Sequence, residues 1–314
     1  MSSEKISIVF GGSGFVGRHL IKRLLSEGRI VYNLDLVENS FRDQNLIFVK
    51  CDVRTPITFD LNLQIEDCYI LAATHRTPGH LPNEYYETNV NGAKNIANWL
   101  DKCKVTKVFF MSSIAVYGNG DEIFTECSNT SPKSDYGKSK LLAEDVFLQW
   151  SNYTKNVRLV ICRASVIFGP GEKGNFTRMA NSIKSGIFVI PTPRKIYKAC
   201  GYVEDLIHSI FFAFSIGDSF ILYNFCFPES PSVQQIAFSL SQSQRKRYPF
   251  TLNLENLTRI TSMLGGQIAA LGQRIEKLTN STHIHPGWLL NNGFEWEFDL
   301  DESLNHWKLI SDFR

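Results

Sequence analysis

The chain has 314 residues, of which 43% are hydrophobic and 20% are charged, a composition typical of a folded globular protein. Its 33 Lys and Arg residues nearly balance its 31 Asp and Glu residues, so it lacks the basic surplus of most nucleic-acid-binding proteins. The seven cysteines include no C-x-x-C pair, so we expect a cytoplasmic protein with no metal site and no disulfide framework. We also expect neither nucleic acid nor a membrane as a partner.

Strand-like and helix-like segments alternate through the first half of the chain. Apolar and β-branched runs predict strands at 5–10, 30–36, 46–49, 69–73, 105–111 and 157–162, and apolar residues at helical spacing predict helices at 15–25, 84–104 and 134–153. This alternation implies βαβ units with right-handed crossovers and a parallel sheet that is covered on both faces. The predicted fold class is therefore α/β, a Rossmann-like doubly wound parallel sheet.

The alternation breaks after Gly169-Pro170-Gly171, and the remaining sequence has weaker strand patterns. The most apolar stretch, 206–227, contains ionisable residues and several serines, so it predicts a buried helix and a strand that return to the sheet rather than a membrane span. The chain thus divides into a Rossmann domain, residues 1–170 and 199–228, and a smaller C-terminal substrate-binding region, residues 171–198 and 229–314.

Two further segments belong to that smaller region. Residues 257–278 have a helical pattern that is interrupted by glycines. Arg245-Lys246-Arg247 is the longest basic run, and we interpret it as a solvated patch because it is too short for a nucleic-acid site.

A glycine-rich segment directly follows the first predicted strand. Gly11-Gly12-Ser13-Gly14-Phe15-Val16-Gly17 has the spacing G-x-x-G-x-x-G and leads into the helix at 15–25. Glycines at these positions let the backbone approach a pyrophosphate, and the positive N-terminus of the helix faces that anion. Asp35, 18 residues after Gly17, can accept hydrogen bonds from ribose hydroxyls and would repel a 2′-phosphate. The motif therefore predicts NAD rather than NADP as the cofactor.

A tyrosine and a lysine share one face of the helix at 134–153. Tyr136 and Lys140 are spaced i, i+4, so the ammonium can lower the pKa of the phenol from about 10 and make it an acid/base. Ser113 follows the strand at 105–111, at the edge of the sheet where doubly wound proteins bind their ligands. Its hydroxyl can hydrogen-bond the substrate oxygen from which Tyr136 takes a proton.

With these motifs in this order, the sequence resembles the extended short-chain dehydrogenase/reductase family, in particular its nucleotide-sugar epimerase/dehydratase branch. The resemblance covers most of the chain, is specific through about residue 170 and is faint between 229 and 285. Besides the motifs above, it rests on several segments of the family pattern, namely Asp52-Val53, Leu71-Ala72-Ala73, Asn89-Val90-Asn91-Gly92, residues 112–118, Arg163 and Phe168-Gly169-Pro170.

The resemblance implies roles for individual residues. Ser113, Tyr136 and Lys140 form its catalytic triad. The residues that it assigns to NAD are Gly11, Gly14, Phe15, Val16, Gly17, Asp35, Asp52, Val53, Ala72, Ala73, Asn89, Tyr136 and Lys140. Those that it assigns to the nucleotide-sugar substrate are Ser113, Asn175 and Lys198. Lys198 stands where relatives often have an arginine, whose bidentate diphosphate contact a lysine cannot make. The family's dimers pair the helices at 84–104 and 134–153, so a homodimer is implied.

In the branch that the sequence resembles, the residues after the position of Ser113 distinguish the reactions that the relatives catalyse. Relatives that remove water across C5 and C6 have an Asp-Glu pair there, those that decarboxylate a uronic acid have a Glu at the position of Ala115, and those that epimerise C3 and C5 have a Cys. Ile114-Ala115 supplies none of these groups, which leaves 4-epimerisation, or simple keto-sugar reduction or alcohol oxidation.

We therefore expect an NAD-dependent nucleotide-sugar 4-epimerase that acts through a transient 4-keto sugar, with a UDP-hexose as substrate. One alternative is a nucleotide 4-keto-sugar reductase, which Asp35 disfavours because such reductions more often use NADPH. Another is a non-catalytic NAD-binding subunit, although such proteins typically lose the Tyr or the Lys.

Overall fold

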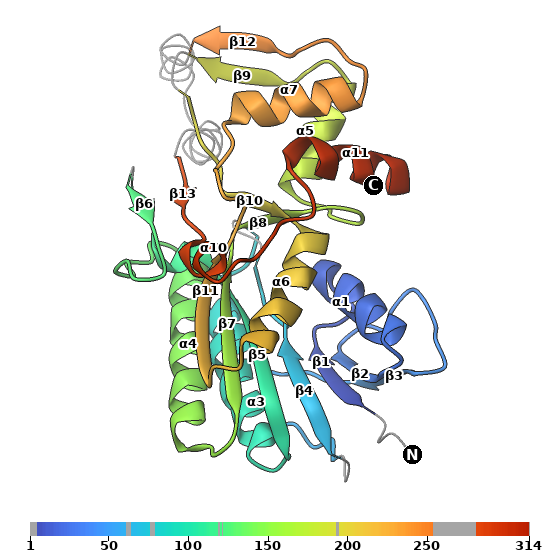
Figure 1. Cartoon of the computed structure of the whole chain (residues 1–314), viewed down its shortest axis with the longest axis vertical. Coiled ribbons are helices and arrows are strands. Elements are labelled where there is room, and N and C mark those ends of the chain that lie inside the picture. The colour runs from blue at the N-terminus through green and yellow to red at the C-terminus, as the bar shows by residue number, and fades with distance from the viewer. Residues whose placement is uncertain are drawn as a thin grey trace.

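A parallel sheet forms the centre of the protein (Figure 1). The computed structural model describes residues 5–60, 64–75, 79–118, 120, 122–192, 195–253 and 281–313. The seven strands lie in the order β11-β7-β5-β4-β1-β2-β3 and pair in parallel. Their bounds are β1 Ile6–Phe10, β2 Ile30–Asp35, β3 Leu46–Lys50, β4 Ile65–Ile70, β5 Val105–Ser113, β7 Arg158–Ala164 and β11 Phe220–Phe225. The predicted Rossmann-like α/β fold is confirmed.

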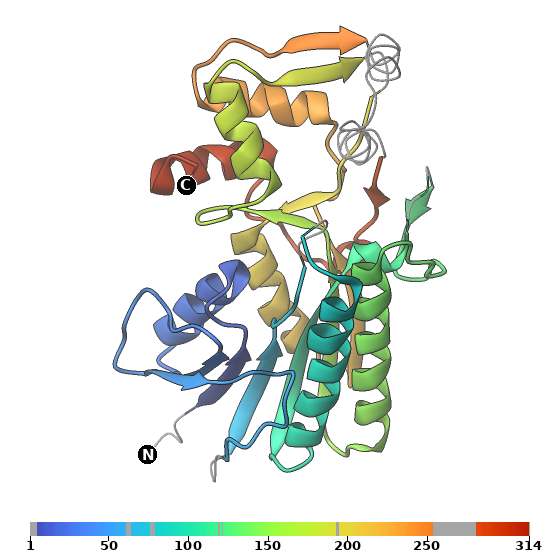
Figure 2. The ribbon, with the colours of Figure 1, turned by 180° about the vertical axis from the view of Figure 1, so that it is seen from behind.

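Helices cover both faces of this sheet. α1 (Phe15–Ser26) and α6 (Val203–Ile216) pack on one face, and α3 (Gly92–Leu100) and α4 (Asp135–Tyr153) pack on the other (Figures 1 and 2). Side chains of a strand point alternately to the two faces, so Ile8 and Phe10 join the core under α3 and α4 while Val9 joins the core under α1 and α6. Because central strands such as β1 are buried on both faces, their sequences are nearly continuous apolar runs rather than alternating ones.

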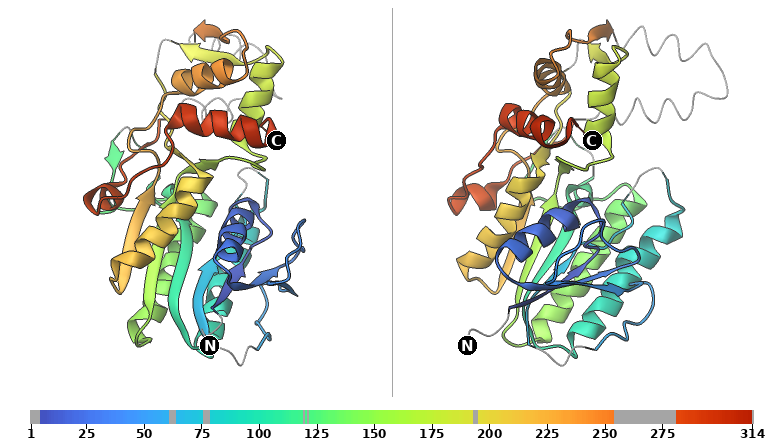
Figure 3. Two further views of the ribbon diagram at one scale, coloured as in Figure 1. Left: turned by 45° about the vertical axis from the view of Figure 1, so that its right-hand side comes forward. Right: turned by 90° about the vertical axis from the view of Figure 1, so that its right-hand side faces the viewer.

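Most other elements lie beyond the carboxyl ends of the strands (Figure 3). They are η2 Ile114–Val116, β6 Ile123–Phe124, β8 Val166–Phe168, α5 Asn175–Lys184, β9 Val189–Thr192, β10 Cys200–Tyr202, α7 Val233–Ser243, β12 Phe250–Asn253, β13 His283–Ile284 and α11 Leu300–Ser311. The short helix α10 (Gly287–Asn291) instead packs against β11, in the core under α1 and α6. A separate aromatic core, centred on Phe168, Tyr202 and Trp307, holds α5, α7 and α11 together. Within the described ranges, no helix has the length and apolar character needed to cross a membrane.

The helix predicted at 84–104 is divided in the structure. A short helix α2 (Pro82–Tyr85) passes into a π-helical turn η1 (Tyr86–Asn91) before α3 begins. A π-helical turn inserts an extra residue into the helix and rotates the side chains that precede it relative to those that follow, and helical periodicity alone does not reveal it. The helical pattern predicted at 257–278 lies outside the described residues.

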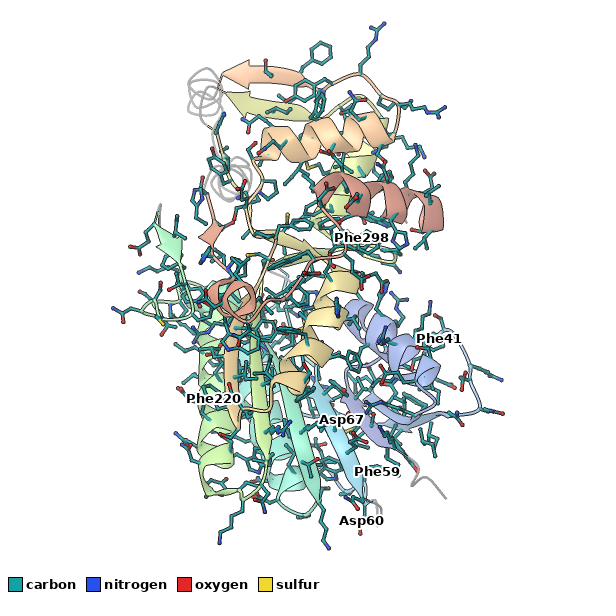
Figure 4. The ribbon with its side chains drawn as sticks, viewed as in Figure 1. Phe41, Phe59, Asp60, Asp67, Phe220 and Phe298 are labelled. Atoms are coloured by element: carbon teal, nitrogen blue, oxygen red, sulfur yellow. The ribbon has the colours of Figure 1, made fainter. Side chains whose placement is uncertain are left out.

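Strand β4 also differs from its predicted bounds of 69–73, since it begins at Ile65 and ends at Ile70. Its early part contains Asp67, a charged residue that hid the strand from an apolar pattern. Asp67 is buried in the sheet (Figure 4) and pairs with Arg29, which also donates a hydrogen bond to Ser7 Oγ at 3.3 Å. Burial raises the pKa of the Asp67 carboxyl, and the charge of Arg29 opposes that shift.

Candidate active site

The glycine-rich loop joins β1 to α1 in a conformation that side chains would not allow. Gly11 has a φ of +82°, and a Cβ there would lie 2.5 Å from the amide nitrogen of Ala72. A Cβ on Gly17 would lie 2.5 Å from the carbonyl oxygen of Gly11. A Cβ on Gly14, the N-cap of α1, would meet just one protein atom within 4 Å, so this side of the loop is open to close approach by a ligand. The first turn of α1 contains no acidic residue, and its amides therefore fit the pyrophosphate of NAD.

Asp35 lies beside this loop at the end of β2. Its carboxylate accepts hydrogen bonds from the backbone amides of Ser13 at 3.0 Å and Val37 at 3.2 Å. The Ser13 hydroxyl in turn donates to the Val37 carbonyl and accepts from Asn33 Nδ2 at 2.9 Å. The end of β2 is thus tied to the glycine loop, and the partly exposed Asp35 carboxylate lies beside that loop, where the sequence predicts the ribose contact.

Ser113 and Tyr136 come together at the carboxyl edge of the sheet. Ser113 ends β5, and its Oγ accepts a hydrogen bond from the Ala115 amide at 3.2 Å. Tyr136 lies in the first turn of α4, where the hydroxyl of Ser134 caps the helix. Burial raises the pKa of Tyr136 above its usual value, and a hydrogen bond with Ser113 opposes the rise. The direction is opposite to the lowering by Lys140 that the sequence predicts.

Lys140 lies one turn further along α4 and is almost fully buried. Its Nζ is 4.2 Å from the centre of the Phe110 ring, a cation–π contact. Burial lowers the pKa of Lys140 to about 7, and the negative charge of Glu144 opposes this shift. The site therefore contains a lysine that titrates near neutral pH.

Glu144 belongs to a buried polar network that the sequence did not reveal. Its carboxylate forms a bidentate pair with Arg163, with Nε–Oε1 at 3.0 Å and Nη2–Oε2 at 2.7 Å, and it accepts a further hydrogen bond from Ser112. Arg163 also donates to the Tyr117 hydroxyl at 3.1 Å. The spacing of Glu144 and Lys140, i and i+4 on one helix, was the available signal.

Asn89 lies in the π-helical turn and links two parts of the site. Its Oδ1 accepts from the Thr74 amide at 2.9 Å, and its Nδ2 donates to the Thr74 carbonyl at 3.1 Å and to Ser139 Oγ at 2.9 Å. Thr74 directly follows Ala72 and Ala73, the predicted NAD contacts after β4. The Asn89 amide thus fixes these contacts relative to α4, which also contains Tyr136.

The two other predicted NAD contacts follow β3. Asp52 is partly exposed and pairs with Arg54 at 2.7 Å, which lowers the pKa of its carboxyl. Val53 is buried, and its carbonyl accepts a hydrogen bond from Asn95 Nδ2 of α3 at 2.8 Å.

The predicted substrate residues belong to the region beyond the sheet. Asn175 opens α5 and is exposed, and its Oδ1 accepts a hydrogen bond from Arg178 at 2.6 Å. Lys198 precedes β10, and its backbone amide donates to the Pro231 carbonyl at 2.8 Å. Burial lowers the pKa of Lys198 to about 8.

The fold and this site define a Rossmann-type enzyme with a Ser-Tyr-Lys set at the carboxyl edge of the sheet, where doubly wound proteins bind their ligands. The sequence model of the NAD dependent epimerase/dehydratase family matches residues 7–224. The chain belongs to this family and is an NAD-dependent enzyme of the epimerase type, as the resemblance implied.

Several known proteins are similar to the chain. The N-acetyl-alpha-D-glucosaminyl-diphospho-ditrans,octacis-undecaprenol 4-epimerase of Escherichia coli O157:H7 is 28% identical over 95% of this chain and 92% of its own length. The UDP-glucose 4-epimerase of Vibrio cholerae is 27% identical over 58% of each chain. The solved UDP-glucuronic acid 4-epimerase of Bacillus cereus in complex with NAD has a TM-score of 0.76 and 19% identity, and the match covers 96% of both chains.

Proposed function

We propose that the protein is an NAD-dependent 4-epimerase of a hexose that is linked to a diphosphate. The proposal rests on one observation: beside Ser113, Tyr136 and Lys140, position 115 is an alanine. The backbone of Ala115 lies directly against the start of α4. A Cβ on Gly137 of that helix would lie 2.4 Å from the carbonyl oxygen of Ala115. Its methyl group cannot move a second proton, so the chemistry needs a single acid/base and a hydride acceptor.

The roles of the residues follow from their positions. Residues 1–170 and 199–228 hold NAD through the glycine loop and Asp35, and NAD supplies the hydride acceptor. Ser113 hydrogen-bonds the 4-oxygen of the sugar, and Tyr136 takes its proton and later returns it. Lys140 binds the nicotinamide ribose, and its ammonium favours the phenolate of Tyr136 during proton transfer.

The sugar is bound by residues 171–198 and 229–314, where Asn175 and Lys198 contact the diphosphate. A UDP-hexose is the substrate that the sequence motifs favour, and the UDP-glucose 4-epimerases among the relatives support it. A second candidate is a hexose whose diphosphate is attached to a polyprenol. A relative that is similar over nearly the whole chain, including this region, is named for such a substrate.

Incubation of the purified protein with each candidate tests the proposal. We expect UDP-N-acetylglucosamine, UDP-glucose or N-acetylglucosaminyl-diphospho-undecaprenol to be converted to its 4-epimer with no reductant added. The product of each is separated by chromatography, and cofactor released from the denatured protein is identified as NAD. A requirement for stoichiometric NADH or NADPH would instead indicate a reductase, and no conversion of any sugar would support a non-catalytic subunit.

A further inference from the structure

Three helices of the region beyond the sheet end at one corner of the molecule. Lys184 at the end of α5 pairs with Asp312 after α11 at 3.1 Å. Gln244 after α7 donates from Nε2 to the Ala180 carbonyl of α5 at 3.0 Å. Lys308 of α11 donates to the carbonyl of the last residue of α7. We call the surface around these helix ends and the adjoining strands β9 and β12 the three-helix corner (Figures 1 and 3).

Large apolar side chains are exposed on this corner: Ile187, Val189, Phe238, Tyr248, Phe250 and Leu309. Val189 and Phe250 are register partners in the parallel pair β9–β12, so their side chains lie on one face, while the neighbouring Ile190 is fully buried on the other. Phe250 is 76% exposed and Leu309 is 85% exposed. Isolated exposed apolar residues are ordinary, but a group of this kind is typical of an interaction surface.

One ring contact and the local chain geometry relate several of these side chains. The rings of Phe238 and Tyr248 are 6.3 Å apart between centroids. Tyr248 and Phe250 flank the buried Pro249, so both lie on the exposed side of an extended segment. Leu309 lines a shallow hollow together with Arg245, so this side chain of α11 lies beside the basic run.

The basic run Arg245-Lys246-Arg247 forms the charged part of the corner. All three residues are exposed, and no ion pair to them is found among the described residues. Residues 171–198 and 229–253 together contain nine Lys and Arg but two Asp and Glu, whereas residues 281–314, which include α11, contain two Lys and Arg but six Asp and Glu. The positive charge of the corner therefore comes from the segment of the basic run and from α5 rather than from α11.

We propose that the three-helix corner binds the surface of an anionic lipid bilayer. Aromatic and aliphatic side chains beside Lys and Arg suit the interface, where apolar groups enter the acyl boundary and cations contact anionic headgroups. A second copy of the chain fits less well, since a two-fold contact centred there would bring the basic run against its own copy. The inference goes beyond the proposed function, and it revises the expectation that the protein has no membrane partner. It agrees with a polyprenol-linked substrate but does not require one.

Sedimentation of the full-length protein with sucrose-loaded vesicles tests the proposal. We expect binding to vesicles of phosphatidylcholine mixed with phosphatidylglycerol, and weak binding to phosphatidylcholine alone. The triple variant Arg245→Gln, Lys246→Gln, Arg247→Gln should lose affinity on the order of a hundredfold, and raised salt should weaken wild-type binding. The double variant Phe250→Ser, Leu309→Ser should also bind more weakly, at unchanged net charge.

Matched variants at other sites distinguish binding by the three-helix corner from non-specific binding by exposed apolar or basic side chains. Phe220, an exposed phenylalanine at the start of β11, lies far from the corner (Figure 4), and Phe220→Ser should leave vesicle binding unchanged. The charge control is Lys102→Gln, Lys104→Gln, Lys155→Gln, three exposed lysines on the Rossmann domain. Retained NAD binding shows that each variant is folded. The proposal would be overturned if wild-type protein bound neither vesicle type, or if the control variants lost as much binding as the corner variants. This holds whatever the outcome of the sugar assays.

Discussion

At the residue scale, burial shifts the pKa values of Tyr136 and Lys140 away from their ordinary values. Burial raises the pKa of the phenol and lowers the pKa of the ammonium to about 7. We expect Tyr136→Phe to reduce turnover by about 10²–10⁴-fold, because it removes the hydroxyl that moves the proton. NAD binding should remain, since the ring still packs. Steady-state rates and an NAD titration check both points, and activity above roughly a tenth of wild type would exclude Tyr136 as the acid/base.

The negative charge of Glu144 opposes the lowering of the Lys140 pKa by burial. Glu144 is therefore a positioning residue, and its effect can be measured. In Glu144→Gln the burial is unopposed, so the pKa of Lys140 should fall below its value of about 7 and the ammonium should persist only in more acidic solution. We expect the pH above which NAD affinity declines to move downward, as followed by calorimetry across the neutral range.

The neighbouring carboxylate provides the control for this experiment. Asp145 is exposed on the same helix, and Asp145→Asn should leave the pH dependence of NAD affinity where it is in wild type. If Glu144→Gln lowers thermal stability but shifts no pH midpoint, Glu144 serves only to hold Arg163.

The residues that the sequence could not predict are buried charges. Glu144 and Asp67 lie at buried positions, where an apolar pattern predicts hydrophobic side chains. Their arginine partners, Arg163 and Arg29, are 19 and 38 residues away in the chain. A pair of this kind becomes visible only when the sheet brings the two residues together. By contrast, Ser113 and Tyr136 were predictable because the ends of strands and the starts of helices are marked locally.

At the scale of elements, the π-helical turn η1 explains how Asn89 reaches two neighbours. Asn89→Ala removes the hydrogen bonds to Thr74 and Ser139 and leaves buried polar groups without partners, which costs about 1–3 kcal/mol for each unsatisfied group. We expect a lower melting temperature together with a reduced kcat, since the segment after β4 is no longer fixed relative to α4. Asn91→Ala, at an exposed position of the same turn, should change neither quantity.

The end of β2 should set the cofactor preference. Asp35 accepts the amides of Ser13 and Val37, so Asp35→Ala alone should weaken NAD binding by loosening the glycine loop as well as by losing the ribose contact. Combined with Val37→Arg, whose position is 66% exposed, it should shift the ratio of dissociation constants toward NADP, because a repelling charge is replaced by an attracting one. Wild-type protein that already prefers NADP would contradict the role of Asp35.

Most elements of the Rossmann sheet were predictable because strands buried on both faces and helices with one apolar face have distinct periods. The predicted bounds of α4 agree with the structure within one residue, since Ser134 is a visible N-cap. The division at 84–104 and the early start of β4 were not predictable, because a π-turn and a buried ion pair leave no periodic signal.

At the scale of the whole molecule, the homodimer implied by the resemblance would have to use the outer faces of α3 and α4. The apolar stripe of these two helices in the sequence comprises Val90, Ala93, Ile96, Ala97, Leu100, Leu141, Leu142, Val146, Phe147 and Trp150. The structure buries most of it in the protein's own core, namely Val90, Ala93, Ile96, Ala97, Leu100, Phe147 and Trp150. Phe147→Glu would therefore disrupt folding rather than a subunit contact. Leu142, 45% exposed on α4, is the stripe residue that stays available.

Leu142→Glu is thus the substitution that tests the dimer. If two copies of α4 meet across a two-fold axis, a glutamate near its centre faces its own copy and repels it. We expect light scattering to give twice the chain mass of 35.7 kDa for wild type and a single chain mass for the folded variant. Leu290→Glu, on α10 at a similarly exposed position, should leave the dimer intact. Wild-type protein that scatters as a single chain at micromolar concentration would show that the stripe serves the core alone, and that each chain holds a complete site.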